Sequence, residues 1–278
     1  MTMPVDTSLP PAGSRDVPAL RAALERDGIA GLPGLFPRPW AERLRLDFEA
    51  ALADARTRER GTIGRGPNRY YFAVHPEAVT GFADLAGHPL LVALFTDLLG
   101  ADYKIVELGF DVPLPGALHQ PWHRDFPAPP ESARRRLTSL ALNVTSVDVT
   151  PEMGPFEIAP GTHWDDGRDF DHGMFPGPEA CSRYERLASR RYPRQGDVSV
   201  RSGLAVHRGT PNVSGTARGV LILGVTARHV ATDVHQLAVR PAYLRGLPDV
   251  VRDHLECTVV DELRPIEQRH DIEGLVMG

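Results

Sequence analysis

Short apolar segments separated by turns fill the second half of this chain and restrict its fold more than any other feature. They are 103–112, 136–147, 155–159, 197–201, 204–207 and 219–228. They are bounded by Gly, Pro and Asn turns. A succession of such strands is typical of a β-sandwich or a β-barrel.

The first hundred residues show a helical pattern instead. Apolar side chains recur at helical spacing after Asp16, and further helices are expected over residues 37–58 and 90–99. Residues 1–15 are rich in Pro, Ser and Gly, which predicts a flexible N-terminal arm. A single domain is therefore expected over residues 16–278, which is long enough to bury a substantial core.

Composition excludes several classes of partner. The net charge of −5 provides no basic field for nucleic acid and no polybasic patch for a membrane surface. The apolar runs are far shorter than the ~20 residues that a membrane-spanning helix needs. The N-terminus lacks the pattern of a signal peptide. We therefore expect a cytoplasmic protein, monomer or homodimer, that binds a small molecule and neither nucleic acid nor membrane.

A His-x-Asp pair carries the strongest chemical signal. His123 and Asp125 are two residues apart, so on a β-strand both side chains point to the same side. The pair alone is a weak signal, but His207 ends a predicted strand-turn-strand unit that can bring it opposite. Two imidazoles and one carboxylate form a facial triad, which leaves three coordination sites of a ferrous ion open. The sequence therefore predicts an iron oxygenase.

Arg218 adds a candidate for binding a second molecule. It follows His207 at the start of the next apolar strand, over residues 219–225. A guanidinium group at that position can hold a dicarboxylate by a bidentate fork, which lysine does less specifically.

Three blocks of the sequence resemble the phytanoyl-CoA dioxygenase-like (PhyH) family of Fe(II)/2-oxoglutarate-dependent oxygenases. They cover residues 122–125, 152–163 and 196–218. The middle block resembles the family's Asn-Gly-Pro…Pro-Gly-Ser-His segment, from which Met153 and Thr162 are mild departures. The helical start of the chain also fits the family.

The resemblance implies the fold and the iron ligands. The fold would be an all-β core with flanking helices, namely a double-stranded β-helix (jelly roll, cupin-like) with N-terminal helices packed on the major sheet. His123, Asp125 and His207 would be the catalytic iron ligands.

The resemblance also implies residues that contact 2-oxoglutarate. Arg218 would bind its distal carboxylate, and Asn143 would make a polar contact. Thr210 is a further candidate, because the family often places a hydroxyl near this position. Gly209 stands two residues after His207 here, which weakens the assignment of Thr210.

The implied reaction consumes 2-oxoglutarate and O2 and releases succinate and CO2. Related halogenases lack the carboxylate ligand, so Asp125 favours hydroxylation or another oxidation. The expected function is oxidation of an unactivated C–H bond of a small organic substrate, in bacterial specialised metabolism.

Substrate contacts are the least constrained part of the prediction. Residues 164–194 form a long stretch without clear periodicity, expected as a lid-like insert. Trp164 and Phe170 from this insert, with Arg69 and Tyr71 from an earlier predicted strand, are candidates to line the mouth of the pocket. Aromatic side chains in such an insert serve equally well to pack the lid itself.

Two neighbours of the triad are assigned other roles. His119 lies outside the i, i+2 pairing and is expected to be solvated or to support the site indirectly. Arg124 points away from the ligands on a strand, so a structural salt bridge is expected.

Two other functions remain open. One is a jelly-roll metal protein without oxygenase turnover, such as a cupin-type isomerase or a ligand sensor, which has no evident need for Arg218. The other is an acyl-CoA- or carrier-protein-tethered hydroxylase. It requires a basic entrance, for which Arg134 to Arg136 and the arginines of the lid-like insert are the candidates.

Overall fold

Two antiparallel sheets form the core of the structure, a computed structural model that describes residues 16–128, 136–230 and 236–269. The strands are β1 (Ile29–Leu32), β2 (Ile63–Gly64), β3 (Arg69–Ala73), β4 (Lys104–Pro113), β5 (Ser139–Thr145), β6 (Phe156–Ile158), β7 (Ser189–Arg191), β8 (Val198–Ser202), β9 (His207–Gly209), β10 (Val220–Thr226), β11 (Ala238–Val239) and β12 (Thr258–Val259). The major sheet has the order β1-β8-β5-β10-β4-β3-β2, and the minor sheet has the order β7-β6-β9. This is the predicted jelly roll. The N-terminal arm expected over residues 1–15 lies outside the described residues.

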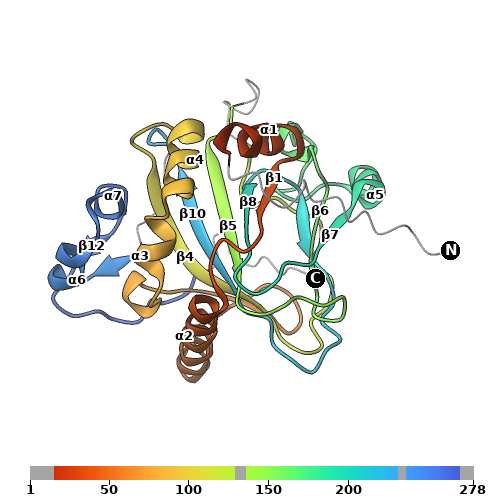
Figure 1. The fold of residues 1–278 in the computed structure, drawn as a ribbon. Coiled ribbons are helices and arrows are strands. Elements are labelled where there is room, and N and C mark those ends of the chain that lie inside the picture. Colours follow the sequence, from red (N-terminus) through yellow and green to blue (C-terminus); the bar gives the residue numbers. More distant parts are fainter. Residues whose placement is uncertain (1–15, 129–135, 231–235, 270–278) are drawn as a thin grey trace.

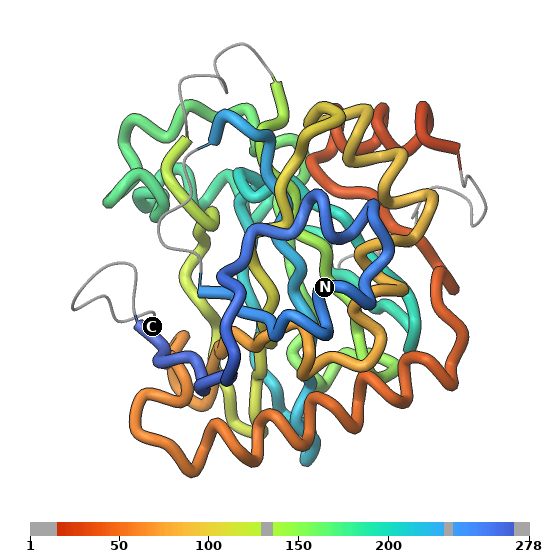
Figure 2. Tube along the Cα trace, turned by 90° about the vertical axis from the view of Figure 1, so that its left-hand side faces the viewer, coloured from red at the N-terminus to blue at the C-terminus, as the bar shows by residue number. Residues whose placement is uncertain are grey.

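The N-terminal helices pack on the major sheet, as predicted. The α-helices of the described residues are α1 (Val17–Asp27), α2 (Arg38–Thr57), α3 (Phe82–Ala86), α4 (Pro89–Leu99), α5 (Pro178–Leu187), α6 (Pro241–Gly246) and α7 (Asp249–Arg252). Leu24, Leu44 and Phe95 from the first helices share one apolar core with Phe110 of β4 and Leu223 of β10. Figure 1 shows α3 and α4 in front of the strands, and Figure 2, turned by 90°, shows α2 along the lower edge. Among the described helices, none is long and apolar enough to cross a membrane.

The predicted strands agree with the structure except at one turn. Five segments correspond to β4, β5, β6, β8 and β10, with ends shifted by up to three residues. The segment 204–207 was wrong as a strand, because Ser202 closes a turn there. Its hydroxyl accepts the N–H of Leu204 (3.2 Å) and its carbonyl accepts the N–H of Ala205 (3.1 Å). β9 therefore begins only at His207.

Side-chain alternation separates the two faces of the major sheet. In β10, Leu221 and Leu223 point into the apolar core under the helices. Ile222 and Gly224 line the cavity on the other face. The face turned away from the helices is thus available for a binding site.

A β-bulge interrupts the pairing of β4 with β10. Glu107 pairs with Gly224, whereas Ile105 pairs with Val225, so Val106 is an extra residue in β4. A bulge of this kind bends the strand and redirects side chains. Both Val106 and Glu107 line the cavity in consequence.

The segment 164–194, expected as a lid-like insert, contains α5 and the edge strand β7. Tyr184 of α5 packs with Trp122 in a small buried cluster, and their ring centroids are 6.3 Å apart. Glu185 accepts hydrogen bonds from Arg208 of β9, which faces away from the cavity (2.6 and 2.9 Å). None of the residues in this fully described segment lines the cavity. It covers the outer side of the minor sheet.

We expect Gly219→Ala to destabilise the fold. A Cβ atom at Gly219 would lie 2.6 Å from the ring of Phe48, which is itself buried against Phe110. The ring would have to shift within a packed core, at a cost of about 1–3 kcal/mol. Urea unfolding measures the loss. Gly215→Ala is the matched control, because its Cβ would meet nothing within 4 Å. Equal unfolding midpoints for the two variants would contradict the prediction.

Candidate active site

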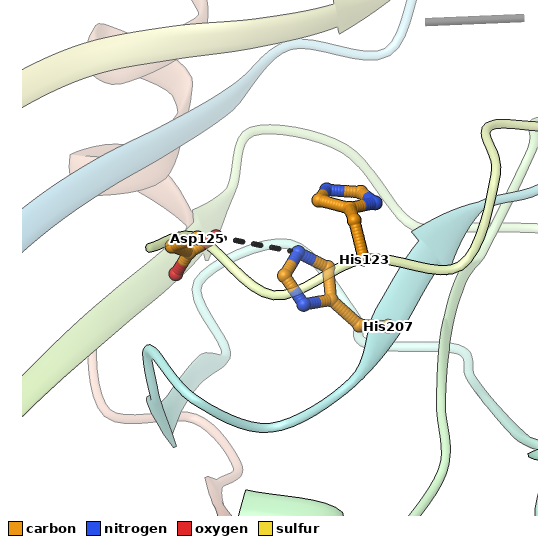
Figure 3. A group of neighbouring side chains, drawn as sticks. All are labelled: His123, Asp125 and His207. Atoms are coloured by element: carbon orange, nitrogen blue, oxygen red, sulfur yellow. Dashed lines mark ion pairs between the residues drawn. The ribbon is translucent and has the colours of Figure 1, made fainter. Parts of the chain in front are cut away.

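A backbone bridge brings the two predicted histidine ligands together. The N–H of His123 donates to the carbonyl of His207 (2.9 Å), and the N–H of His207 donates to the carbonyl of His123 (2.8 Å). Asp125 follows outside the named strands, where its N–H donates to the carbonyl of Gly203 (3.0 Å). One ligand atom from each of the three side chains lies within 4.8 Å of the other two. Figure 3 shows the three side chains approaching one another from these two segments.

Backbone carbonyls fix the tautomer of both histidines. The Nδ1 atom of His123 lies 2.9 Å from the carbonyl oxygen of Pro121, and the Nδ1 atom of His207 lies 2.9 Å from that of Ala205. A carbonyl only accepts hydrogen bonds, so each Nδ1 carries the proton. Each Nε2 then keeps a lone pair for a metal ion. In agreement, the Nε2 atom of His207 lies 3.5 Å from the Oδ1 atom of Asp125.

The protonation states suit metal binding. Burial lowers the pKa of His123 to about 4 and lowers the pKa of His207 well below its usual value, so both are neutral near pH 7. Burial alone would raise the pKa of Asp125, but the charge of Arg201 and its hydrogen bonds to the carboxylate outweigh it, and that pKa is about 2. The site therefore offers two neutral imidazoles and one carboxylate, as a divalent ion requires.

The metal-free protein is expected to lose stability as the pH falls from about 6.5 to about 4. In the unfolded chain the pKa of His123 returns to about 6.5, whereas in the folded chain it is about 4. Between these values the unfolded state binds a proton that the folded state does not. Stability then falls by about 1.4 kcal/mol per pH unit for each such histidine. Urea unfolding without metal at pH 7 and pH 5 measures the slope. His123→Gln should remove the contribution of one proton, and an unchanged slope would contradict the assignment.

Arg201 of β8 holds the carboxylate ligand. Its guanidinium group donates to both oxygens of Asp125, at 2.5 and 3.2 Å, and its side chain is only 4% exposed. A bidentate pair of this kind fixes the plane of a carboxylate. The negative charge of Asp125 is thus already oriented in the absence of metal.

A cavity of about 690 Å³ lies between the sheets. The triad lines it, as do Arg218 and Arg69. Residues from β3, β4, β5 and β10 form its floor, and Phe156 of β6 and Gly209 of β9 contribute from the minor sheet. Its volume is in the range of small-molecule sites.

Arg218 is a buried cation held by the middle sequence block. Its Nε atom donates to the carbonyl of Met153 (3.1 Å) and its Nη2 atom to that of Gly154 (2.8 Å). Burial lowers its pKa to about 10, and the positive charge of Arg69 adds to this while Asp111 opposes it. The guanidinium group stays charged at neutral pH. Two buried guanidinium groups near a single aspartate favour an anionic ligand.

The other two residues assigned to 2-oxoglutarate differ in their surroundings. Asn143 lines the cavity, and its buried Oδ1 atom has no hydrogen-bond partner among the described residues. The hydroxyl of Thr210 donates to the carbonyl of Pro155 (2.7 Å), and Thr210 does not line the cavity. Asn143 is therefore the better placed of the two to meet a ligand.

Of the four residues predicted to contact the substrate, two line the cavity and two do not. Arg69 and Tyr71 line the cavity. Trp164 lies elsewhere, with its Nε1 atom donating to the carbonyl of Glu25 (2.9 Å). Phe170 packs under Arg124, whose guanidinium carbon is 4.4 Å from the ring centroid. Neither aromatic ring lines the cavity. Trp164 packs against the main apolar core, and Phe170 packs in the small cluster of Trp122 and Tyr184.

The neighbours of the triad are placed as follows. His119 is exposed, in line with a solvated role. Arg124 is buried, but within the described residues its Nη2 atom donates to the carbonyl oxygen of Asp165 (3.1 Å) rather than to a carboxylate. The salt bridge expected for Arg124 was therefore wrong, since the ring of Phe170 and a backbone carbonyl take that place.

Two residues that line the cavity, Arg201 and Glu107, were not predicted from the sequence. Arg201 is in register with Ala141, and Glu107 is in register with Gly224, so both stand in one row across the cavity floor. Alternation along β8 could have indicated Arg201, because it stands among apolar strand residues. The orientation of Glu107 could not be predicted from alternation along β4, because the bulge at Val106 changes which residues face the cavity.

Comparison with known proteins identifies the family. A family model described as phytanoyl-CoA dioxygenase (PhyH) matches residues 24–220. The chain belongs to this family. It is thus a 2-oxoglutarate-dependent enzyme of the PhyH type, and its triad is the one described above.

Solved structures share the fold of this PhyH protein. AviO1 from Streptomyces viridochromogenes Tue57 is 19% identical, with a TM-score of 0.60, over 80% of this chain and 99% of that one. HygX from Streptomyces hygroscopicus, solved with nickel and 2-oxoglutarate bound, is 16% identical, with a TM-score of 0.56, over 80% and 90%. The carbocyclase SnoK from nogalamycin biosynthesis is 19% identical, with a TM-score of 0.60, over 79% and 86%.

The residues of this PhyH protein fit iron and 2-oxoglutarate. Two imidazoles with fixed tautomers and one carboxylate form the donor set of non-haem iron oxygenases. The unpartnered Oδ1 atom of Asn143 and the buried charge of Arg218 lie in the same cavity. When bound, iron supplies the coordination sites at which 2-oxoglutarate and O2 react.

Proposed function

We propose that this PhyH protein hydroxylates an unactivated C–H bond of a small organic molecule. In the overall reaction, 2-oxoglutarate loses CO2 and becomes succinate. One oxygen atom of O2 enters succinate, and the other enters the substrate as a hydroxyl group. The observation that carries the proposal is the conjunction, in one cavity, of an oriented His-Asp-His site with a buried arginine.

The chain's own residues divide the work of binding. His123, Asp125 and His207 would hold the iron, and Arg201 would keep Asp125 charged and oriented. Arg218 would bind the distal carboxylate of 2-oxoglutarate, for which a guanidinium fork is well suited. The remainder of the cavity would place the substrate and exclude water.

The similar structures guide the choice of substrates to test. SnoK is described as a carbocyclase and SnoN as an epimerase, the latter in complex with Fe3+, alpha ketoglutarate and nogalamycin RO. One fold thus supports several oxidative outcomes, so substrate pose would decide the product. These descriptions support a role in specialised metabolism.

Anaerobic titration of the metal-free protein with Fe(II) and then 2-oxoglutarate tests the proposal. A weak visible charge-transfer band should appear in the presence of both. Incubation with ¹⁸O2 and a turned-over substrate should then place one labelled oxygen in succinate and one in the product. An iron-loaded protein that shows no band and forms no succinate would reject the oxygenase function.

The rival functions gain less support. A sensor or isomerase has no evident use for Arg218 beside an open metal site. The carrier-tethered hydroxylase depends on Arg134 to Arg136, of which only Arg136 belongs to the described residues, and on the arginines of residues 164–194, none of which lines the cavity. Succinate formation with a free small molecule would separate the proposed function from both.

A further inference from the structure

One carboxyl group in the cavity has no task in binding iron or 2-oxoglutarate. Glu107 of β4 lines the cavity, as the triad does. Burial raises the pKa of Glu107, and the charge of Asp125 adds to this rise. A partly buried carboxyl group of this kind needs a hydrogen-bonding partner.

Tyr71 of β3 fixes the position of this carboxyl group. Its hydroxyl donates to the Oε1 atom of Glu107 at 2.6 Å. The Tyr71 hydroxyl reaches across Gly109 of β4, because a Cβ atom there would lie 2.4 Å from it. One oxygen of Glu107 is thereby occupied, and its orientation is set.

A second glycine makes room for the other oxygen. A Cβ atom at Gly224 of β10 would lie 2.8 Å from the Oε2 atom of Glu107. Gly224 pairs with Glu107 on one side and with Ala141 on the other. The Oε2 atom of Glu107 therefore lies over the space that Gly224 leaves open. Within the described part of the chain no hydrogen bond engages this atom, so it can meet a ligand placed there.

Two unpartnered hydroxyl groups stand in the next row of the floor. Ser139 and Thr226 are paired in register on β5 and β10, and both line the cavity. They are 4% and 8% exposed, and their hydroxyl oxygens have no hydrogen-bond partner among the described residues. Buried polar groups left unpaired are costly, so this end of the cavity favours a polar occupant.

Two guanidinium groups near Glu107 disfavour a cationic occupant. Arg65 lies over the ring of Tyr71, with its guanidinium carbon 5.0 Å from the centroid. Burial raises the pKa of Glu107, and the positive charges of Arg65 and Arg201 oppose that rise. An ammonium group would be repelled by these guanidinium groups and by bound iron. A plain acyl chain would leave the polar floor unpaired.

We propose that Glu107, positioned by Tyr71, binds a hydroxyl group of the substrate, and that the substrate is a neutral polyhydroxylated molecule. The proposal rests on the proposed function for its reaction and adds the substrate class. Glu107 is then the anchor for the substrate, and Tyr71 is a positioning residue that acts through it. Ser139 and Thr226 would supply further hydrogen bonds to the same molecule.

The test measures the binding of defined probes to the protein loaded with Fe(II) and 2-oxoglutarate under anaerobic conditions. The probes are methyl α-glucopyranoside and myo-inositol for polyols, hexylamine for cations and hexanoate for acyl chains. Saturation-transfer NMR and perturbation of the visible band report binding. We expect the polyols to bind and the other two probes to bind more weakly.

Variants then test the residue assignment. Glu107→Ala should weaken polyol binding by roughly 10- to 100-fold, since a buried hydrogen-bond partner is lost. Glu107→Gln keeps the shape and an acceptor for Tyr71, so its loss should be smaller, and Tyr71→Phe should lie between the two. Glu59→Gln, an exposed carboxylate elsewhere, is the matched control.

The affinity for 2-oxoglutarate separates this proposal from the proposed function. It should be unchanged in all four variants, because these side chains are not assigned to the co-substrate. A wild-type protein without a visible band would contradict the proposed function itself. A normal band with no polyol binding up to ~10 mM, or with undiminished binding in Glu107→Ala, would overturn the inference. If Glu107→Ala does not fold, Glu107→Gln carries the comparison.

Discussion

Replacing His207 by alanine is expected to abolish 2-oxoglutarate turnover. The variant loses one of the three metal donors, and the other two cannot hold the ion in the open geometry that the reaction needs. Iron affinity should fall by more than the roughly 10- to 100-fold that loss of an outer hydrogen-bond partner costs. Succinate formation should fall about a thousandfold or more, which corresponds to about 4 kcal/mol. Iron content after gel filtration and succinate release measure the two effects.

His119→Ala is the matched control for this loss. His119 is only four residues before His123 but is exposed and does not line the cavity. Its removal should leave iron content and succinate release close to those of the wild type. Equal losses in the two variants would show that general damage to this region, and not a missing ligand, explains the result.

Arg218→Ala is expected to raise the Kd for 2-oxoglutarate by about 100-fold or more. Hydrogen bonds to a charged partner are worth about 1.5–3 kcal/mol each, and a guanidinium fork makes two. The cavity would also lose a buried positive charge near Arg69. Titration of the visible band with 2-oxoglutarate measures the affinity, and iron loading should remain normal.

A truncated co-substrate gives the sharpest control. 2-Oxobutyrate keeps the keto acid end but lacks the distal carboxylate, so the wild-type protein should bind it weakly. Arg218→Ala should bind 2-oxobutyrate and 2-oxoglutarate about equally. If the variant still preferred 2-oxoglutarate as strongly as the wild type, another residue would bind the distal carboxylate. Arg69, the other buried guanidinium in the cavity, would then be the residue to test.

The sequence predicted the parts of the site that depend on local spacing. His123 and Asp125 come from one short segment, and His207 follows a turn that small polar residues close. Strand periodicity and turn residues are enough to place such groups. The helices on the major sheet were predicted for the same reason, because their apolar spacing is visible along the chain.

The parts that were missed depend on pairing between distant strands. Arg201 reaches Asp125 only because β8 lies beside β5 in the major sheet. Trp164 and Phe170 were expected at the pocket mouth, but Trp164 hydrogen-bonds to Glu25 of α1 and Phe170 packs with Tyr184 of α5. No local pattern records which strands are neighbours, so sheet order and the side of the minor sheet that α5 covers had to come from the structure.

The extra residue in β4 divides that strand into two parts with opposite parity. On the N-terminal side of Val106, the odd-numbered residues Tyr103 and Ile105 are buried in the apolar core under the helices. On its C-terminal side, the even-numbered residues Leu108 and Phe110 are buried there. Tolerance to polar substitution should therefore switch from even to odd positions along a single strand. Loss of one residue at the bulge would shift the frame of everything upstream, turning core side chains toward the substrate without changing a single residue of the iron site.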